Sequence, residues 1–301
     1  MRVFVFGDCH IGRYNLQQVT EESFVVWDWV EKHIAQVDIV IFLGDRFRSR
    51  DPEGSIRDIG DVGLWRIAKK KPVIAICGNH DFYYKHGSIE NNYGVMKQID
   101  NVTVVVDRAK VQLDGVNLEF LAFNQIPSGQ GDYLFMHDEI IGVCSWARTG
   151  IQEGSLRGYK KVYSGHIHQR MKKDNITYIG VPFQQDFKDG EVTGGLIVDL
   201  ATGMETWIDG YGIKFVTGLR DSLVDCVVRV ETEEQKEEAL KRGALFVEVI
   251  ESQEATVVEA TESAVNMEGW ESWIDEYVDR YADGSQVHKN IGRMLIDTAV
   301  E

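Results

Sequence analysis

Five apolar runs in the chain end in side chains that commonly bind metal ions. The segments are FGDCH, FLGDR, CGNHD, FMHDE and SGHIH, and each places aspartate, asparagine or histidine near a glycine or a turn. The candidate site residues in them are Asp8, His10, Asp45, Asn79, His80, Asp81, His137, His166 and His168. Burying such groups is unfavourable unless they are paired or bind a metal ion. The set as a whole therefore predicts a two-metal centre and an enzyme.

The spacing within two of these segments supports the same prediction. Asp8 and His10 are separated by one residue, and so are His166 and His168. Since side chains alternate along an extended chain, both members of each pair can point to one face. A single GD or HxH element is usually structural, so the prediction depends on all five segments occurring together.

The elements that must position these residues follow from hydrophobic periodicity. Apolar runs at 3–6, 39–43 and 73–77 predict strands, and helical patterns near 21–35 and 56–70 lie between them. This order is typical of a βαβαβ unit, whose strands deliver ligands at their carboxyl ends. Trp27 and Trp29 fall in the first helical pattern, and we expect them to pack in the core.

The pattern changes after residue 102. Short strands joined by Gly and Asp turns, as in KVQLDGVNLEF, predict a second sheet that is mostly antiparallel. Two sheets facing each other with helices outside would bury both sets of strands. We therefore expect an α/β protein with a four-layer α/β/β/α sandwich, followed by a small α+β cap and a C-terminal helical hairpin.

The domain boundaries are predicted from a Gly-rich polar stretch at 209–222. We expect a main domain at 1–214, the cap at 215–266 and a C-terminal helical segment at 267–301. The cap should contain strands near 225–230 and 245–251 and a helix near 233–242. The helical segment carries two apolar stripes that either pack on the cap or bind a partner. These stripes are Trp270, Trp273, Ile274, Tyr277, Val278 and Tyr281, then Val287, Ile291, Met294 and Leu295.

The net charge of -16 is concentrated near the C-terminus. Residues 231–301 contain 18 acidic and 6 basic residues, whereas the first 230 residues contain 30 and 26. A DNA-binding surface on the first 230 residues is therefore permitted, because phosphate binding depends on local Lys and Arg. No apolar run approaches the ~18 residues of a membrane span, and the N-terminus lacks signal-peptide features. We expect a cytoplasmic protein.

The five motifs resemble those of the calcineurin-like metallophosphoesterases over residues 1–209. Within that superfamily, GDCHIGR, GDRFRSR and YKKVYSGHIHQ with YIGVPFQQDF resemble SbcD-type nuclease subunits of recombination and repair complexes, especially the tailed-phage versions. The resemblance implies two metal ions, with Mn²⁺ expected. An oxygen and nitrogen ligand set without Cys fits Mn²⁺ and would also accept Fe or Zn. The implied ligand sets are Asp8, His10, Asp45 and His168 for one ion, and Asp45, Asn79, His137 and His166 for the other.

The resemblance also implies roles for three residues outside these ligand sets. His80 would steady the scissile phosphate or protonate the leaving 3′-oxygen, and Asp81 would orient the His80 ring. Arg48 stands where many relatives carry Asp or His, and we expect that it can contact the DNA backbone.

We expect the chain to be a two-metal DNA nuclease, with exonuclease and endonuclease activity. It would be the nuclease subunit of an ATP-dependent complex, a homodimer within a heterotetramer that binds an SbcC-type SMC-like ATPase through its C-terminal helices. The alternatives are a stand-alone phosphatase or cyclic-nucleotide phosphodiesterase, and a non-catalytic scaffold. A scaffold would normally have lost ligands. A small-molecule phosphatase would not need an acidic tail that ends in paired amphipathic helices.

Overall fold

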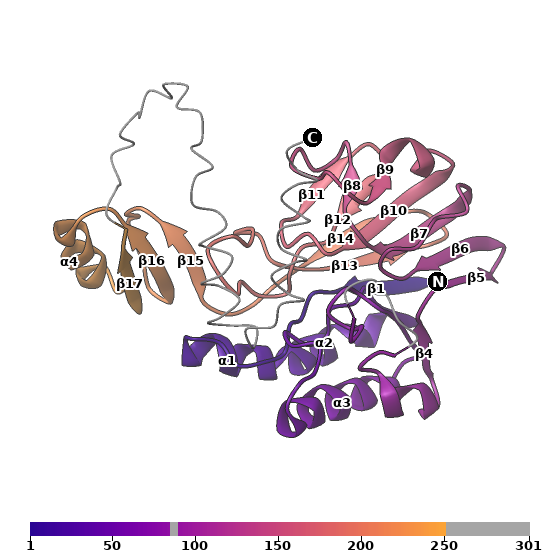
Figure 1. Ribbon diagram of the computed structural model, residues 1–301, viewed down its shortest axis with the longest axis horizontal. Coiled ribbons are helices and arrows are strands. Elements are labelled where there is room, and N and C mark those ends of the chain that lie inside the picture. Colours follow the sequence, from indigo (N-terminus) through magenta and orange to yellow (C-terminus); the bar gives the residue numbers. More distant parts are fainter. Residues whose placement is uncertain (85–89, 251–301) are drawn as a thin grey trace, which may run out of the picture. The chain divides into compact units, whose positions relative to one another are not determined.

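The computed structural model describes residues 1–84 and 90–250 (Figure 1). The chain divides into two compact units, Met1–Glu251 and Ser252–Glu301, and the described residues all belong to the first. The predicted C-terminal helices and their two apolar stripes lie outside the described residues. Among the helices that are described, none combines the length and hydropathy that crossing a membrane would require.

The first six-stranded sheet has the order β14-β13-β1-β2-β3-β4. Its strands are β1 (Arg2–Phe6), β2 (Ile39–Phe42), β3 (Val73–Ile76), β4 (Val102–Val105), β13 (Gly194–Asp199) and β14 (Glu205–Asp209). Strands β1 to β4 are parallel, and β13 and β14 continue the sheet in antiparallel pairing. The connecting helices are α1 (Gln17–Phe24), α2 (Val26–His33), η1 (Ile34–Gln36), α3 (Gly54–Ala68) and η2 (Gly94–Gln98). The predicted βαβαβ unit is confirmed.

The second six-stranded sheet has the order β11-β12-β10-β7-β6-β5. Its strands are β5 (Arg108–Leu113), β6 (Val116–Leu121), β7 (Gly131–His137), β10 (Tyr159–Gly165), β11 (Met171–Lys173) and β12 (Ile176–Tyr178). The prediction of a mostly antiparallel sheet is wrong, because β6, β7, β10 and β12 are parallel neighbours. Parallel pairing sets Gly165 opposite His137. The two strands that lead into histidine motifs therefore end at the same edge of the sheet.

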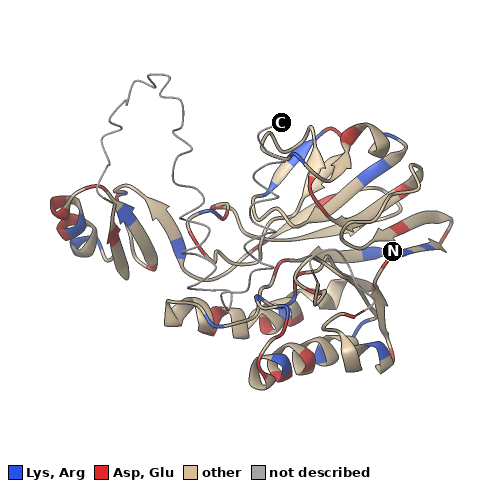
Figure 2. Cartoon of the chain, viewed as in Figure 1, with Lys and Arg blue, Asp and Glu red and all other residues tan. Residues whose placement is uncertain are grey.

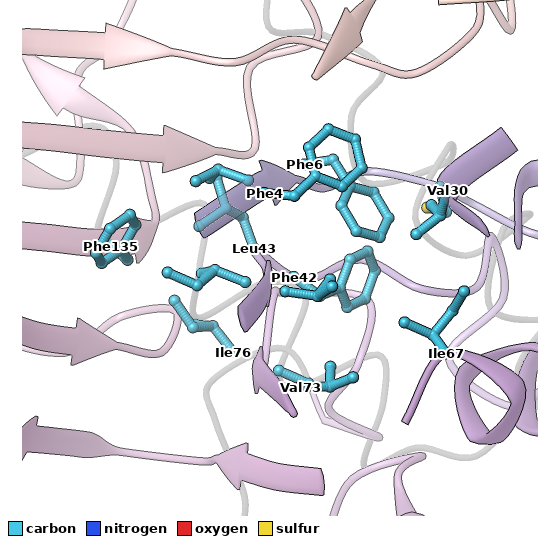
Figure 3. Packing of buried hydrophobic residues seen from close by; sticks show 14 of the residues in the cluster. Phe4, Phe6, Val30, Phe42, Leu43, Ile67, Val73, Ile76 and Phe135 are labelled. Carbon is cyan, nitrogen blue, oxygen red and sulfur yellow. The ribbon is translucent and has the colours of Figure 1, made fainter. Parts of the chain in front are cut away.

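The main core lies on both faces of the first sheet (Figure 3). Phe6 packs against Trp27 of α2 and against Phe42, with ring centroids 6.1 and 5.1 Å apart. Trp27 and Trp29 are 2% and 6% exposed, which confirms their predicted place in the core. Phe135 of β7 belongs to the same cluster from the facing sheet. Burial on both faces explains why the parallel strands are almost continuously apolar.

The two faces of the second sheet are covered differently. Along β7, Phe135 faces the first sheet, whereas Leu134 and Met136 belong to a separate apolar cluster on the other face. In the described part of the chain this outer face is covered by β8 (Ile140–Ile141), β9 (Ile151–Gln152) and η3 (Glu153–Leu156), with no α-helix. The predicted α/β class with two facing sheets is confirmed, and its fourth layer is built from this short-strand segment.

A small parallel sheet follows the two large ones. It consists of β15 (Lys214–Thr217), β16 (Cys226–Val230) and β17 (Phe246–Val249), with α4 (Glu233–Lys241) between the last two strands. Thr232 begins α4 with a capping box, accepting from the backbone N–H of Gln235. Acidic and basic residues are interspersed along α3 and α4 (Figure 2). The strands near 225–230 and 245–251 and the helix near 233–242 are present, and β15 adds a strand within the stretch 209–222 where the domain boundary was predicted.

Candidate metal centre

The seven predicted metal ligands come together where β1, β2, β3, β7 and β10 end. Six of them, together with His80, form three overlapping groups, and within each group the potential ligand atoms lie within 4.8 Å of one another. The groups are Asp8, His10 and His168; Asp45, His137 and His166; and His10, Asp45 and His80. Asn79 joins the second group, because its Oδ1 lies 3.0 Å from His137 Nε2 and 2.9 Å from His166 Nδ1.

Sharp backbone turns direct these side chains back toward the sheet edges. Asp8, His10, Asp45 and His166 all have positive φ, with values of 54°, 42°, 55° and 77°. Residues other than glycine seldom adopt this left-handed backbone conformation. It costs on the order of 1–3 kcal/mol per residue and is frequent at functional sites. Gly78 permits the close approach, since a Cβ there would lie only 2.3 Å from Asp45 Oδ1. The glycine in CGNHD is therefore required by the site itself.

Asp45 lies between the two groups of ligands. Its Oδ2 is 3.5 Å from His10 Nε2, and its Oδ1 is 3.5 Å from His137 Nε2. The carboxylate is buried, and Oδ1 also accepts a 2.8 Å hydrogen bond from the backbone N–H of His80. One carboxylate thus offers an oxygen to each side, which is the arrangement that a bridging ligand needs.

The outward nitrogens of two histidines are fixed by hydrogen bonds. His137 Nδ1 lies 2.6 Å from the carbonyl oxygen of Leu43, and His168 Nδ1 lies 2.6 Å from Asp189 Oδ1. Because these acceptors require an N–H at Nδ1, the Nε2 atoms can present lone pairs to the centre. His168 Nε2 faces His10 Nε2 at 3.1 Å. Two lone pairs at this distance repel each other unless a proton or a metal cation lies between them.

Carboxylates near the site favour positive charge on two of its histidines. Burial disfavours a charged His137, yet the Asp45 carboxylate raises its pKa to about 10. Burial likewise opposes charge on His168, but the hydrogen bond to Asp189 raises its pKa to about 9. Burial also opposes ionisation of Asp45, while the neighbouring His137 and His10 hold its pKa well below the usual range. A buried carboxylate surrounded by imidazole nitrogens and an amide oxygen is a donor set that divalent metal ions fit.

Residues 1–179 match the calcineurin-like phosphoesterase family. The chain belongs to this family. Its members use divalent metal ions, so the predicted superfamily and the expectation of divalent metal ions agree with the match. Exonuclease subunit 1 of Enterobacteria phage T4 is 26% identical over 122 residues, which is 36% of this chain and 36% of that protein. The chain therefore matches about a third of the length of this relative.

Two solved structures match this chain with low TM-scores. One is described as a novel archaeal phosphodiesterase; it has a TM-score of 0.38 and 15% identity, and the match covers 69% of this chain and 99% of that one. The other is a protein of unknown function from Aquifex aeolicus, with a TM-score of 0.34 and 15% identity over 60% of this chain and 88% of that one.

The structure changes the expected role of Asp81. Its carboxylate is fully buried and accepts from the backbone N–H groups of Gly78, Asp45 and Arg46 at 2.9, 2.8 and 3.1 Å. It thus ties the loop after β3 to the loop after β2. The His80 ring is held instead by a 2.7 Å contact between its Nδ1 and the carbonyl oxygen of Arg48. The expectation that Asp81 orients the His80 ring is corrected accordingly.

Two residues near the site had no role assigned from the sequence. Asp189 holds His168 and also accepts a 2.6 Å bond from the backbone N–H of Gln185. The Gln185 side chain in turn donates to the carbonyl oxygen of Asp8 at 2.9 Å. Both lie in FQQDFKD, which overlaps YIGVPFQQDF, the segment that carried part of the family likeness. Metal-binding histidines usually donate a hydrogen bond to a carboxylate or a carbonyl oxygen. An acidic residue without an assigned role in FQQDFKD was therefore the sequence signal that could have identified Asp189.

Proposed function

We propose that the chain is a two-metal-dependent DNA nuclease that hydrolyses phosphodiester bonds as an exonuclease and endonuclease. The observation that carries the proposal is the position of Asp45, with one carboxylate oxygen toward each group of metal-type ligands. The nuclease assignment, in preference to another phosphoesterase activity, is supported by the likeness to a phage exonuclease subunit.

The proposed ligands divide into two sets that share Asp45, and the ions are proposed to be Mn²⁺. One set is Asp8, His10, Asp45 and His168, and the other is Asp45, Asn79, His137 and His166. When bound, two such ions supply Lewis acidity toward a phosphate and lower the pKa of a water molecule.

The chain's own residues contribute orientation and a proton. The carbonyl oxygen of Arg48 accepts the Nδ1–H of His80, so the ring is held at the wall of the cavity that the ligands line. An imidazolium in this position can donate its Nε2 proton to a leaving 3′-oxygen. Asp189 fixes the orientation of the His168 ring, and Asp81 fixes the backbone of the turns after β2 and β3. The ligand side chain and the turns therefore need not reorganise during the reaction.

We further propose that the nuclease binds DNA and an SbcC-type SMC-like ATPase in the cytoplasm, the host cytoplasm if it is phage-encoded, as a homodimer within a heterotetramer. The division into domains 1–214, 215–266 and 267–301 belongs to this proposal. Deletion of residues 268–301, which lie outside the described residues, should leave metal binding and nuclease activity but abolish co-purification with the ATPase. Full-strength capture of the ATPase by the shortened chain would contradict the assignment of the partner surface.

The nuclease proposal is tested by incubating the purified chain with Mn²⁺ and either linear DNA or p-nitrophenyl phosphate. We expect DNA to be consumed, and Asp45→Asn to abolish cleavage and weaken binding of both ions because it removes the shared negative charge. Asp58→Asn, an exposed position on α3, is the matched control. Consumption of p-nitrophenyl phosphate alone would favour a stand-alone phosphatase, and normal DNA cleavage by Asp45→Asn would exclude the two-metal proposal.

A further inference from the structure

One face of the small sheet carries an aromatic side chain at its edge. Phe215, Val227 and Phe246 are paired across β15, β16 and β17, so they form one row on one face. Phe215 and Val227 are 7% and 2% exposed, because they pack on Val19 and Phe183 of the main body. Phe246 continues the row on the last strand and remains 49% exposed. Its ring is thus held by the sheet but is not covered by it.

Phe246 and the metal-type ligands line the same cavity. This cavity has a volume of about 780 Å³, within the range of about 300–1,000 Å³ that is usual for small-molecule sites. His10, Asp45 and His80 lie in its lining with Phe246. A molecule with a phosphate at the ligands can therefore extend toward the Phe246 ring without leaving the cavity.

The aromatic neighbours of Phe246 are already engaged. Arg229 lies 4.0 Å over the centre of the Phe187 ring, and the Phe215 ring meets Phe187 edge-on at 5.0 Å. Arg229 is itself paired with Glu248 at 2.9 Å. Within residues 1–84 and 90–250, no ring or cation stacks on Phe246. It is the aromatic face that remains available to a ligand at this end of the cavity.

The charges near Phe246 indicate what kind of group would bind there. Glu248 and Asp186 line the cavity close to the small sheet, and Arg48 is the one Lys or Arg among the described lining residues. The Asp186 carboxylate repels a phosphate, and Glu248 is already paired with Arg229, so this end of the cavity favours a flat, uncharged group. A nucleobase has these properties, and stacking on an aromatic ring accepts any base.

We propose that Phe246 stacks on a nucleobase of the DNA strand whose phosphate lies at the metal centre. The proposal rests on the nuclease function proposed above and adds a base-binding subsite supplied by the small sheet. Because the contact is to the face of the base, it contributes affinity for single-stranded or unpaired nucleotides and little sequence preference.

The test compares Phe246→Ala, Phe246→Trp and the control Leu245→Ala in the full chain. Leu245 is 46% exposed on the same domain and does not line the cavity. The substrates are a single-stranded oligothymidine and a backbone of equal length built from abasic residues, each cleaved with Mn²⁺. We expect Phe246→Ala to raise KM for oligothymidine about 10-fold, in the range seen when stacking aromatics are truncated. KM for the abasic backbone should not change, and Phe246→Trp and Leu245→Ala should behave like the parent.

A binding measurement provides a readout that is independent of cleavage. An oligonucleotide containing 2-aminopurine, bound in the presence of EDTA, should lose fluorescence with the parent and Phe246→Trp but retain it with Phe246→Ala. An unchanged KM in Phe246→Ala, or an equal rise for both substrates, would overturn the base-stacking proposal while the nuclease function stands. If the parent leaves both oligonucleotides and linear DNA intact, the nuclease proposal fails and the subsite fails with it.

Discussion

His168 Nδ1 lies 2.6 Å from Asp189 Oδ1, and the other carboxylate oxygen accepts from the backbone N–H of Gln185 and Asp186. Asp189 is 7% exposed, whereas His168 reaches the cavity with its opposite nitrogen. The carboxylate therefore fixes both the orientation and the tautomer of a proposed metal ligand without touching the ion.

Asp189→Asn should weaken Mn²⁺ binding about 10- to 100-fold, as is typical when the carboxylate behind a metal-binding histidine is lost. The amide keeps the size of the side chain, so the fold should be retained. Isothermal titration with Mn²⁺ measures the effect, with Asp221→Asn, an exposed position outside the cavity lining, as the control. Unchanged affinity in Asp189→Asn would show that the pair does not support the metal site.

His80→Ala should retain two bound metal ions while cleaving DNA about 10²- to 10⁴-fold more slowly, the usual effect of removing a general acid. The reason is that the carbonyl oxygen of Arg48 holds the His80 ring, and the proposed role of this ring is to donate a proton to the leaving 3′-oxygen rather than to bind metal. Metal content by mass spectrometry and single-turnover rates measure the two effects separately. Loss of a metal ion would instead place His80 among the ligands, through the group that it forms with His10 and Asp45.

Arg48→Ala should weaken DNA binding equally for all sequences and lower the slope of log Kd against log salt by roughly 1. The Arg48 guanidinium lies 4.3 Å over the Tyr14 ring at the wall of the cavity, where it can meet a phosphate. Because only the side chain is removed, the carbonyl that holds His80 remains. Arg66→Ala on α3 is the control, and a salt dependence identical to the parent would exclude a phosphate contact.

Glu205→Gln should lower stability at neutral pH by about 1–3 kcal/mol. Glu205 of β14 bonds Lys161 and Tyr163 of β10 and Lys172 of β11, each at 2.9 Å, and so links the two large sheets. Burial opposes ionisation of Glu205, but the bonds from the two lysines hold its pKa below the usual 4.5. This stabilisation is present above the unfolded pKa and is lost as pH falls through the folded pKa.

The difference in Tm between parent and Glu205→Gln should therefore be largest near pH 7 and should shrink below about pH 4. Thermal melts across this range provide the measurement, with Glu233→Gln on the exposed side of α4 as the control. A difference in Tm that does not change with pH would mean that the charge of Glu205 contributes nothing to stability.

Much of the site could be predicted from the sequence because its signals are local. Hydrophobic periodicity located β1, β2, β3 and the helices between them. The residue types at the ends of the strands identified the seven candidate ligands that the structure brings together. Both signals depend only on neighbouring residues in the chain. Because parallel strands end at one edge of the sheet, the two signals together predict that these residues lie close together.

The tertiary structure decided what depends on contacts between distant segments. Short turns suggested antiparallel strands, yet β7 and β10 pair in parallel across the loop between them. The hydrogen-bond partner of His80 is Arg48, that of His168 is Asp189, and that of Asp45 is Asp81. No periodic spacing in the sequence predicts any of these three pairs. Likewise, KFVT becomes strand β15 only because β16 supplies its hydrogen bonds. Residue types and local periodicity determined which groups could do the chemistry, whereas long-range pairing decided which group orients each of them, because hydrogen bonds form between neighbours in space rather than in sequence.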